Sequence, residues 1–244
     1  MFRRRPRPAK PRRRRRVSRW LARRLILPAA TLVASFAMAV LLVLVFRVVN
    51  PPTTYLIATE AQRLGGVARQ WRELDLMPRH VALAFVGAED AGFCAHSGFE
   101  WEAIEAALRE REDGGRLRGG STITQQVAKN VFLWPARSWT RKGLEAVFTV
   151  LIEGLWPKRR IVEVYLNVAE TGEGLFGVEA AAQAYFGGPA ARLTATEAAL
   201  IAAALPNPKA RNPKRPTGGM RRRAAGIRAS AETLAATDQG ACLL

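Results

Sequence analysis

A dozen consecutive residues in the middle of the chain combine chemical groups that an ordinary helix has little use for. Residues 119–130 read GGSTITQQVAKN and hold a glycine pair, three hydroxyls, two glutamines and a lysine. Glycines let a backbone approach a ligand closely, hydroxyls and amides suit a sugar, and a lysine suits an anion. The residues expected to bind substrate in this segment are Gly120, Ser121, Thr122, Gln125, Gln126, Lys129 and Asn130.

Two further polar clusters flank this segment and supply carboxylates. Glu89 and Asp90 end an apolar stretch, where burial and a neighbouring like charge raise the pKa of a carboxyl group such as Glu89. Such a group accepts a proton from a sugar hydroxyl as a general base, whereas the alternative is a solvated helix end. Glu145 follows Arg141 by four residues, which on spacing alone is typical of a surface ion pair. Glycosyl transfer, however, generically uses two carboxylates.

Helical periodicity dominates the elements that must position these groups. Thr122 or Ser121 is expected to cap the central helix, which places Gln126 and Lys129 near one face. No strand-like alternation of useful length occurs, and the final residues are expected to fray, so we predict an all-α body. Helices are expected over residues 78–89, 101–111, 122–133, 139–155, 159–168, 176–185, 194–205 and 220–234.

The N-terminal region has the pattern of a membrane anchor. Residues 25–46 form an uncharged run of 22 residues, long enough to cross a bilayer as a helix, with Pro28 in its first turn. The Arg-rich flank at residues 12–24 predicts a cytoplasmic N-terminus. A cleaved signal peptide is the alternative, because Ala37-Met38-Ala39 fits a cleavage pattern. Cleavage there would leave an apolar new N-terminus, so we expect an uncleaved anchor.

Charge and cysteine content narrow the classes of function. The formal charge is +18, but residues 1–24 hold thirteen of the 38 basic residues and no acid, leaving 25 basic against 20 acidic residues. A basic run directly before an apolar span is typical of topology and anionic-lipid contact, so no nucleic-acid partner is expected. A disulfide between Cys94 and Cys242 is one alternative in an oxidising compartment, but two cysteines do not make a disulfide framework, and two unpaired thiols are favoured. No cysteine or histidine spacing indicates a metal site.

Three motifs in register resemble one known family. Glu-Asp-x-x-Phe-x-x-His-x-Gly at residues 89–98, the 119–130 segment, and Arg-Lys-x-x-Glu at 141–145 are similar in order and spacing to the glycosyltransferase domain of peptidoglycan polymerases. This is glycosyltransferase family 51, the transglycosylase domain of penicillin-binding proteins. The resemblance continues through residues 158–167 and 176–181 and covers about 55–215. One departure is Glu100, where the family usually has Asp.

The resemblance implies a fold and a mechanism. It implies a mainly helical, two-lobed, lysozyme-like domain that polymerises lipid II into β-1,4-linked glycan strands, with inversion and release of undecaprenyl diphosphate. Glu89 would be the general base and Glu145 the second catalytic carboxylate, while Lys129 with Arg137 or Arg141 would neutralise the diphosphate. No cofactor is implied, and nothing in the sequence indicates a divalent cation. Further substrate-binding residues implied by the motifs are Asp90, Phe93 and His96.

The expected organisation is a basic cytoplasmic tail at 1–24, a transmembrane anchor at 25–49 and a periplasmic glycosyltransferase domain at 50–240 of a bacterial inner-membrane protein. Expected partners are lipid II, the growing glycan strand, membrane lipid and other wall-synthesis or division proteins. No Ser-x-x-Lys or Lys-Thr-Gly box occurs, so no transpeptidase activity is expected. Two alternatives remain open: a lytic, lysozyme-like glycan-cleaving enzyme, and an inactive membrane scaffold.

Overall fold

The computed structural model describes residues 14–102, 105, 109, 121–136 and 138–243. The chain divides into two compact units, Met1–Leu42 and Val43–Leu244. Helix α1 (Arg14–Val48) carries the apolar stretch Ile26–Val48, which is long and apolar enough to cross a membrane. Pro28 lies in the first turn of this apolar stretch, as predicted, but α1 begins at Arg14, so the proline stands in the interior of the longer helix. Among the described residues α1 is the one helix that meets this length and composition, and it supports a single-pass membrane anchor.

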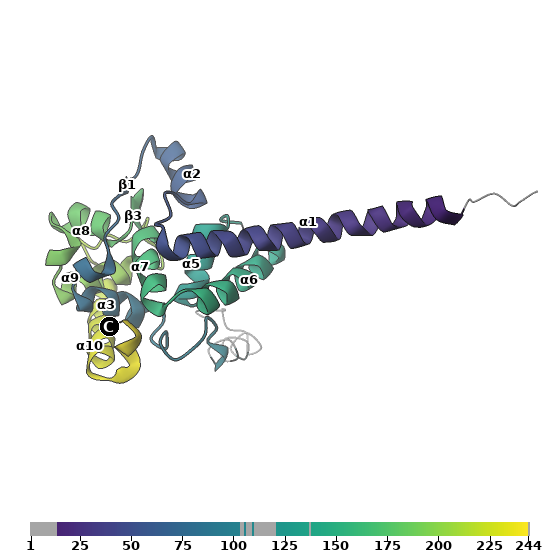
Figure 1. Cartoon of the computed structure of the whole chain (residues 1–244). Coiled ribbons are helices and arrows are strands. Elements are labelled where there is room, and N and C mark those ends of the chain that lie inside the picture. Colours follow the sequence, from purple (N-terminus) through teal and green to yellow (C-terminus); the bar gives the residue numbers. More distant parts are fainter. Residues whose placement is uncertain (1–13, 103–104, 106–108, 110–120, 137, 244) are drawn as a thin grey trace, which may run out of the picture. The chain divides into compact units, whose positions relative to one another are not determined.

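The body is mainly helical, as predicted (Figure 1). Apart from α2, which was not predicted, the longer helices begin and end within about two residues of the positions predicted from apolar periodicity, and the bounds of α6 match the prediction at both ends. The longer helices are α2 (Tyr55–Leu64), α3 (Arg79–Glu89), α5 (Ile123–Phe132), α6 (Trp139–Leu155), α7 (Lys158–Val168), α8 (Val178–Phe186), α9 (Ala195–Ala204) and α10 (Gly218–Ala236). Short 3-10 turns are η1 (Leu74–Leu76), η2 (Ala190–Arg192) and η3 (Asp238–Leu243).

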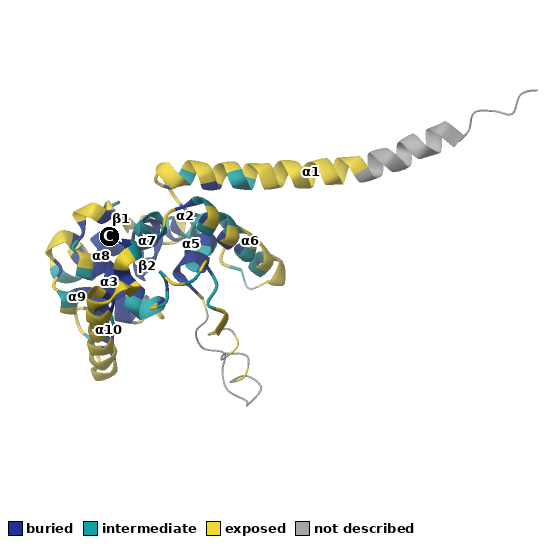
Figure 2. Ribbon diagram, turned by 60° about the horizontal axis from the view of Figure 1, so that its bottom comes forward, coloured by how far each residue is buried: buried dark blue, intermediate teal, exposed yellow. Residues whose placement is uncertain are grey.

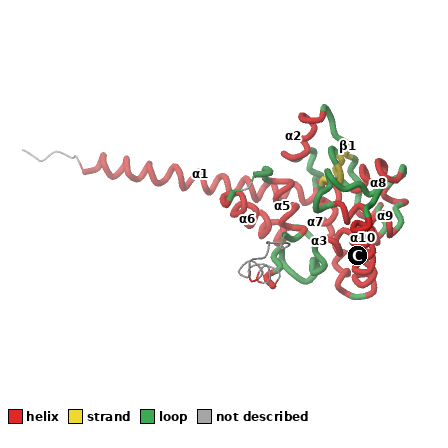
Figure 3. Tube along the Cα trace, turned by 180° about the vertical axis from the view of Figure 1, so that it is seen from behind, coloured by secondary structure: helices red, strands yellow, loops and turns green. Residues whose placement is uncertain are grey.

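The helices of the body form two groups. Helices α3, α9 and α10 pack on one another, while α5 packs against α6 and α7, and α7 also touches α3 (Figure 3). In α3, every residue from Val81 to Val86 is buried, so this helix runs through the core (Figure 2). Because the last residue of α3 is Glu89, the core itself fixes the position of this carboxylate. The two groups confirm the two-lobed, mainly helical architecture.

A small sheet was not foreseen from the sequence. Strands β1 (Ala68–Arg69), β2 (Glu170–Gly172) and β3 (Leu175–Phe176) lie in the order β1-β3-β2, with β1 parallel and β2 antiparallel to β3. Strands of two or three residues are too short for a period-2 pattern to show. One of them takes up Phe176, so α8 begins two residues later than predicted.

The two cysteines are paired, and the prediction of two unpaired thiols is wrong. Cys94 and Cys242 form a disulfide with their Cα atoms 5.6 Å apart. The expectation of a frayed C-terminus is also wrong, because η3 packs against α7 and α10 and buries Leu243. A guanidinium nitrogen of Arg159 donates a hydrogen bond to the Leu243 carbonyl at 2.7 Å. Helix α10 returns along α3, and this long-range packing brings the two sulfurs together.

Part of one predicted helix lies outside the described residues. For the expected helix at 101–111, only Trp101, Glu102, Glu105 and Arg109 are described, and these four are helical. Of the predicted site residues, Gly120 and Arg137 lie outside the described residues.

Candidate active site

Glu89 stands at the end of α3 with its carboxylate in reach of two other helices. The Gln126 side chain on α5 donates a hydrogen bond to Glu89 Oε2 at 3.0 Å. Arg223 on α10 approaches Glu89 Oε1 at 3.9 Å. The Glu89 side chain is 16% exposed, so it can be reached from solvent while most of its surface is buried.

Burial raises the pKa of Glu89 above its ordinary value. The Gln126 hydrogen bond and the charges of Arg223 and Lys129 act in the opposite direction, whereas the Asp90 charge adds to the rise. The cause is therefore mainly desolvation, which the neighbouring partners compensate only in part. A carboxylate with a raised pKa is a stronger proton acceptor when ionised, which is the property that a general base needs.

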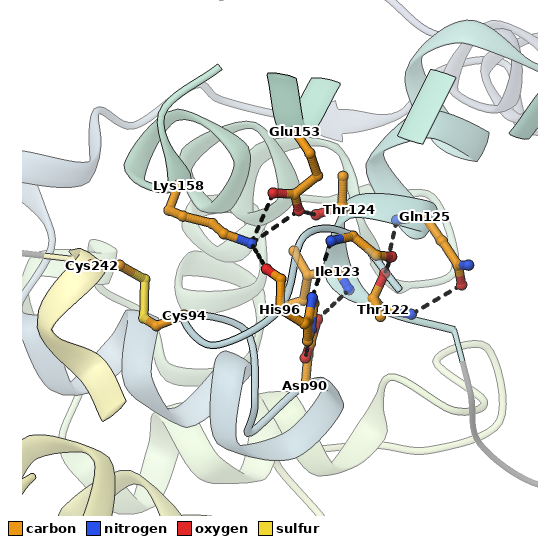
Figure 4. A network of polar contacts seen from close by, with 11 residues as sticks. Asp90, Cys94, His96, Thr122, Ile123, Thr124, Gln125, Glu153, Lys158 and Cys242 are labelled. Carbon is orange, nitrogen blue, oxygen red and sulfur yellow. Dashed lines mark hydrogen bonds and ion pairs between the residues drawn. A yellow bond between two sulfur atoms is a disulfide. The ribbon is translucent and has the colours of Figure 1, made fainter. Parts of the chain in front are cut away.

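Asp90, next to Glu89, has the opposite environment (Figure 4). Its buried carboxylate accepts from His96 Nε2 at 2.7 Å through Oδ1 and from the Ile123 backbone N–H at 2.9 Å through Oδ2. The Gly98 backbone N–H donates to His96 Nδ1 at 3.1 Å, which leaves Nε2 as the protonated nitrogen of a neutral ring. Asp90 and His96 were predicted to bind substrate, but these polar atoms are engaged within the protein. They hold the start of α5 against the end of α3.

The start of α5 is fixed by a second set of contacts. Thr122 and Gln125 form a capping box, and the Thr122 hydroxyl donates to the Gly98 carbonyl at 2.7 Å. Both side chains are buried. The predicted cap is thus confirmed, but Thr122 and Gln125 stabilise the helix start and are not exposed to a ligand. Ser121, one residue earlier, is exposed.

A partly buried ion pair supports this network from α6 and α7. Thr124 donates to Glu153 at 2.5 Å, and Lys158 Nζ lies 2.9 Å from Glu153 Oε2. Lys158 also donates to the His96 carbonyl at 2.7 Å and lies over the Phe93 ring, 4.3 Å from its centroid. Phe93 is fully buried. Its ring packs inside the protein, and its predicted contact with substrate stays a prediction.

One face of α5 carries polar side chains that are not fully buried. Gln126, Lys129 and Asn130 are three and four residues apart, and all are partly exposed. Burial lowers the pKa of Lys129; the charges of Arg141 and Lys142 act in the same direction, and those of Glu145 and Glu89 oppose it. The Lys129 ammonium is thus within electrostatic range of both predicted catalytic carboxylates.

Glu145 is not the surface ion pair that its spacing alone allows. Its side chain is 4% exposed, with Arg141 Nη1 at 2.5 Å from Oε2 and Lys142 Nζ on Oε1. Arg141 is held in turn by a hydrogen bond to the Ala136 carbonyl. Two cations thus fix this buried carboxylate.

A pocket of about 320 Å³ adjoins these groups. The cations Lys129 and Arg141 and the amide of Asn130 face it, and its remaining walls are largely apolar. Oxyanions are bound by such sets of cationic and amide donors. The pocket is lined by Leu56, Lys129, Asn130, Leu133, Pro135, Ala136 and Arg141.

Comparison with known proteins identifies the family. A sequence profile described as Transglycosylase matches residues 57–232. The chain belongs to this transglycosylase family.

Three relatives carry the name biosynthetic peptidoglycan transglycosylase. The protein from Rhodospirillum centenum is 51% identical over 217 residues, covering 88% of this chain and 94% of the relative. The one from Xanthomonas axonopodis pv. citri is 47% identical over 233 residues, covering 93% and 92%. The one from Caulobacter vibrioides is 49% identical over 193 residues, covering 79% and 83%. The family predicted from the three motifs is confirmed.

Sequence reasoning missed two groups at the site of this transglycosylase. Lys142 binds Glu145 directly, and its position next to Arg141 was an available signal. Arg223 reaches Glu89 from α10, more than a hundred residues along the chain, and no local pattern points to it. Among the described residues of the transglycosylase, no cluster of three or more His, Cys, Asp or Glu is placed to hold a metal ion.

Proposed function

We propose that this transglycosylase polymerises lipid II into β-1,4-linked glycan strands. The observation that carries the proposal is the pairing of Glu89, a carboxylate with a burial-raised pKa, with the partly buried Lys129 on the adjacent face of α5. One group suits the abstraction of a proton and the other suits an anionic leaving group. The names of the close relatives support peptidoglycan as the product.

The proposed step is an in-line displacement. Glu89 takes the proton of the acceptor's GlcNAc 4-hydroxyl while the oxygen attacks the anomeric carbon of the donor's MurNAc. The bond from that carbon to the diphosphate oxygen breaks, and its electron pair leaves with undecaprenyl diphosphate. Attack opposite an α-linked leaving group gives the β-linkage. Gln126 orients the Glu89 carboxylate, since it holds one of its two oxygens.

The leaving diphosphate is placed in the pocket lined by Lys129, Asn130 and Arg141. Glu145 keeps Arg141 and Lys142 in place and balances the positive charge around Lys129 when no substrate is bound. These cations supply charge that would otherwise come from a metal ion, so we expect polymerisation without a cofactor. Activity in the presence of EDTA tests this expectation, and its loss with recovery on adding Mg²⁺ would contradict it.

An inner-membrane location suits a substrate whose lipid tail stays in the bilayer. The Arg-rich flank of α1 favours a cytoplasmic N-terminus and a periplasmic catalytic domain. Exposed apolar side chains on α6 support a further contact with lipid: Trp139 is 90% exposed and Val150 is 61% exposed. In proteoliposomes, brominated lipids should quench the fluorescence of the parent more than that of Trp139→Ser. Equal quenching would remove this contact from the proposal.

The decisive experiment incubates the detergent-solubilised protein with labelled lipid II or with a preformed glycan strand. We expect polymer from the parent, none from Glu89→Gln, and no shortening of the strand. Shortening of the strand would identify a lytic enzyme. A folded parent that acts on neither substrate would identify a scaffold and end the proposal.

A further inference from the structure

A second basic pocket, of about 310 Å³, lies beside the first turns of α10. Three arginines line it: Arg211, Arg215 and Arg223. The same pocket contains the polar side chains of Asn212 and Thr217. It shares no lining residue with the pocket of Lys129 and Arg141.

The surroundings of this pocket are strongly positive. Residues 205–231 contain eight lysines and arginines and no acidic residue. Within the described residues, no carboxylate lies within 4.0 Å of Arg211 or Arg215, and Arg223 has only Glu89 at 3.9 Å. Cations that face one another without anions repel, and a bound oxyanion converts this repulsion into charge-assisted hydrogen bonds.

Arg223 joins this pocket to the proposed general base. Its side chain lines the pocket and also approaches Glu89 Oε1, and it is 42% exposed. The hydroxyl that Glu89 deprotonates belongs to the acceptor, whereas the leaving diphosphate of the donor is assigned to the pocket of Lys129 and Arg141. The pocket of Arg211, Arg215 and Arg223 is therefore joined through Arg223 to the group that acts on the acceptor, and it is distinct from the pocket assigned to the donor.

We infer that the pocket of Arg211, Arg215 and Arg223 binds an oxyanion of the acceptor lipid II. This inference rests on the proposed function, because that reaction brings together two substrates that each carry anionic groups. The oxyanion is either the acceptor's diphosphate or a carboxylate of its stem peptide, and both bind to guanidinium groups in the same way. The pocket fixes the acceptor so that its sugar hydroxyl meets Glu89.

The test separates the acceptor from the donor. A labelled lipid II whose GlcNAc 4-hydroxyl is blocked acts only as donor, and unlabelled lipid II is the varied acceptor. The initial rate of label transfer gives one KM for the acceptor and one for the donor. The variants are Arg215→Gln and Arg211→Gln; the matched controls are Arg221→Gln and Arg222→Gln, which remove the same charge from exposed positions of α10 outside the pocket lining. Thermal melting checks folding, since Arg211 also donates to the Ala203 carbonyl.

We expect each pocket variant to raise the acceptor KM about tenfold, as the loss of a charge-assisted contact does, with the donor KM and kcat little changed. The controls should match the parent. An acceptor with an amidated, uncharged stem peptide identifies the anion: the effect of Arg215→Gln persists with it if the diphosphate is bound and vanishes if a carboxylate is bound.

Two results would overturn the inference while leaving the proposed function intact. One is a parental acceptor KM in both pocket variants. The other is an equal rise in the controls, which would indicate attraction of the whole basic surface to anionic membranes. A parent that forms no polymer would instead contradict the proposed function itself, so the two failures are distinguishable.

Discussion

The buried polar groups around the start of α5 and those around its next turn have opposite surroundings. At its start, both Asp90 oxygens accept hydrogen bonds and Thr122 is bound through a capping box. Around the next turn, the side chains of Glu89 and Lys129 are mostly buried, and their partners offset the cost of burial only in part. Desolvation therefore raises the pKa of Glu89 and lowers that of Lys129, which favours the neutral form of both groups. The residue types are similar in the two regions, and the difference lies in how many partners each charge has.

This difference separates stability from chemistry. A carboxylate whose two oxygens both accept hydrogen bonds stabilises the fold, whereas a desolvated one costs stability and gains reactivity. We therefore expect substitutions at the start of α5 to affect mainly unfolding and substitutions at Glu89 to affect mainly turnover. The four predictions that follow test this division.

The largest effect is expected for Glu89→Gln. Loss of the general base should lower polymerisation about 10²- to 10⁴-fold. The same variant should be more stable than the parent at pH 7: a carboxyl pKa raised in the folded state means that stability falls as pH rises above about 4.5. The gain should therefore vanish at low pH, where the parent is also neutral.

Thermal melting of Glu89→Gln at pH 7 and pH 4 measures this change in stability. Glu232→Gln, at an exposed residue of α10, is the control and should leave both activity and stability unchanged. A less stable Glu89→Gln at pH 7 would show that the Gln126 and Arg223 contacts outweigh the cost of burial.

The disulfide should contribute the next largest effect, and it should act on stability. It closes a loop with a sequence separation of 148 residues, for which chain entropy gives at most about 5 kcal/mol. We expect the double variant Cys94→Ser, Cys242→Ser to unfold at a lower denaturant concentration, with turnover at 20 °C within about threefold of the parent. A loss of turnover without a loss of stability would place Cys94 in the catalytic region.

Asp90→Asn should destabilise the fold by about 1–3 kcal/mol, because an amide NH₂ must then face either His96 Nε2–H or the Ile123 N–H. Urea unfolding gives the free energy. The folded fraction should keep most of its affinity for lipid II. A large rise in the KM for lipid II with unchanged stability would instead show that Asp90 binds substrate.

The smallest effect concerns pH. Polymerisation should increase as pH rises through the raised pKa of Glu89, because only the ionised carboxylate accepts a proton. Arg223 lowers this pKa, so Arg223→Gln should move the acidic limb of kcat to higher pH. Other groups acting on Glu89 are Gln126, Lys129 and Asp90. The displacement is small because Arg223 is half-exposed and screened by solvent. If the acidic limb of kcat does not move in Arg223→Gln, Arg223 does not act on the pKa of Glu89.

Local signals predicted much of this fold. The cap at Thr122, the bounds of α6 and the end of α3 at Glu89 follow from residues within one or two turns. The motifs also located the carboxylates and Lys129. Roles were harder to assign: Thr122, Gln125 and Phe93 lie in the right motifs but are buried, and burial depends on packing that a spacing does not encode.

The remainder required long-range contacts. The pairing of Cys94 with Cys242 and the approach of Arg223 to Glu89 both depend on where α10 returns in space. The sheet was not predicted for a different reason: its strands have only two or three residues, so they show no periodic pattern in the sequence.

The bond between Cys94 and Cys242 also makes most of the body a covalent ring. Lys129, Glu145 and the arginines of the second pocket lie inside this ring, and Glu89 lies five residues before it. A protease that cuts any single peptide bond between the two cysteines therefore produces a nicked chain that still migrates as one molecule until it is reduced. The helix that carries the base and the helix that carries Arg223 stay joined through such a cut.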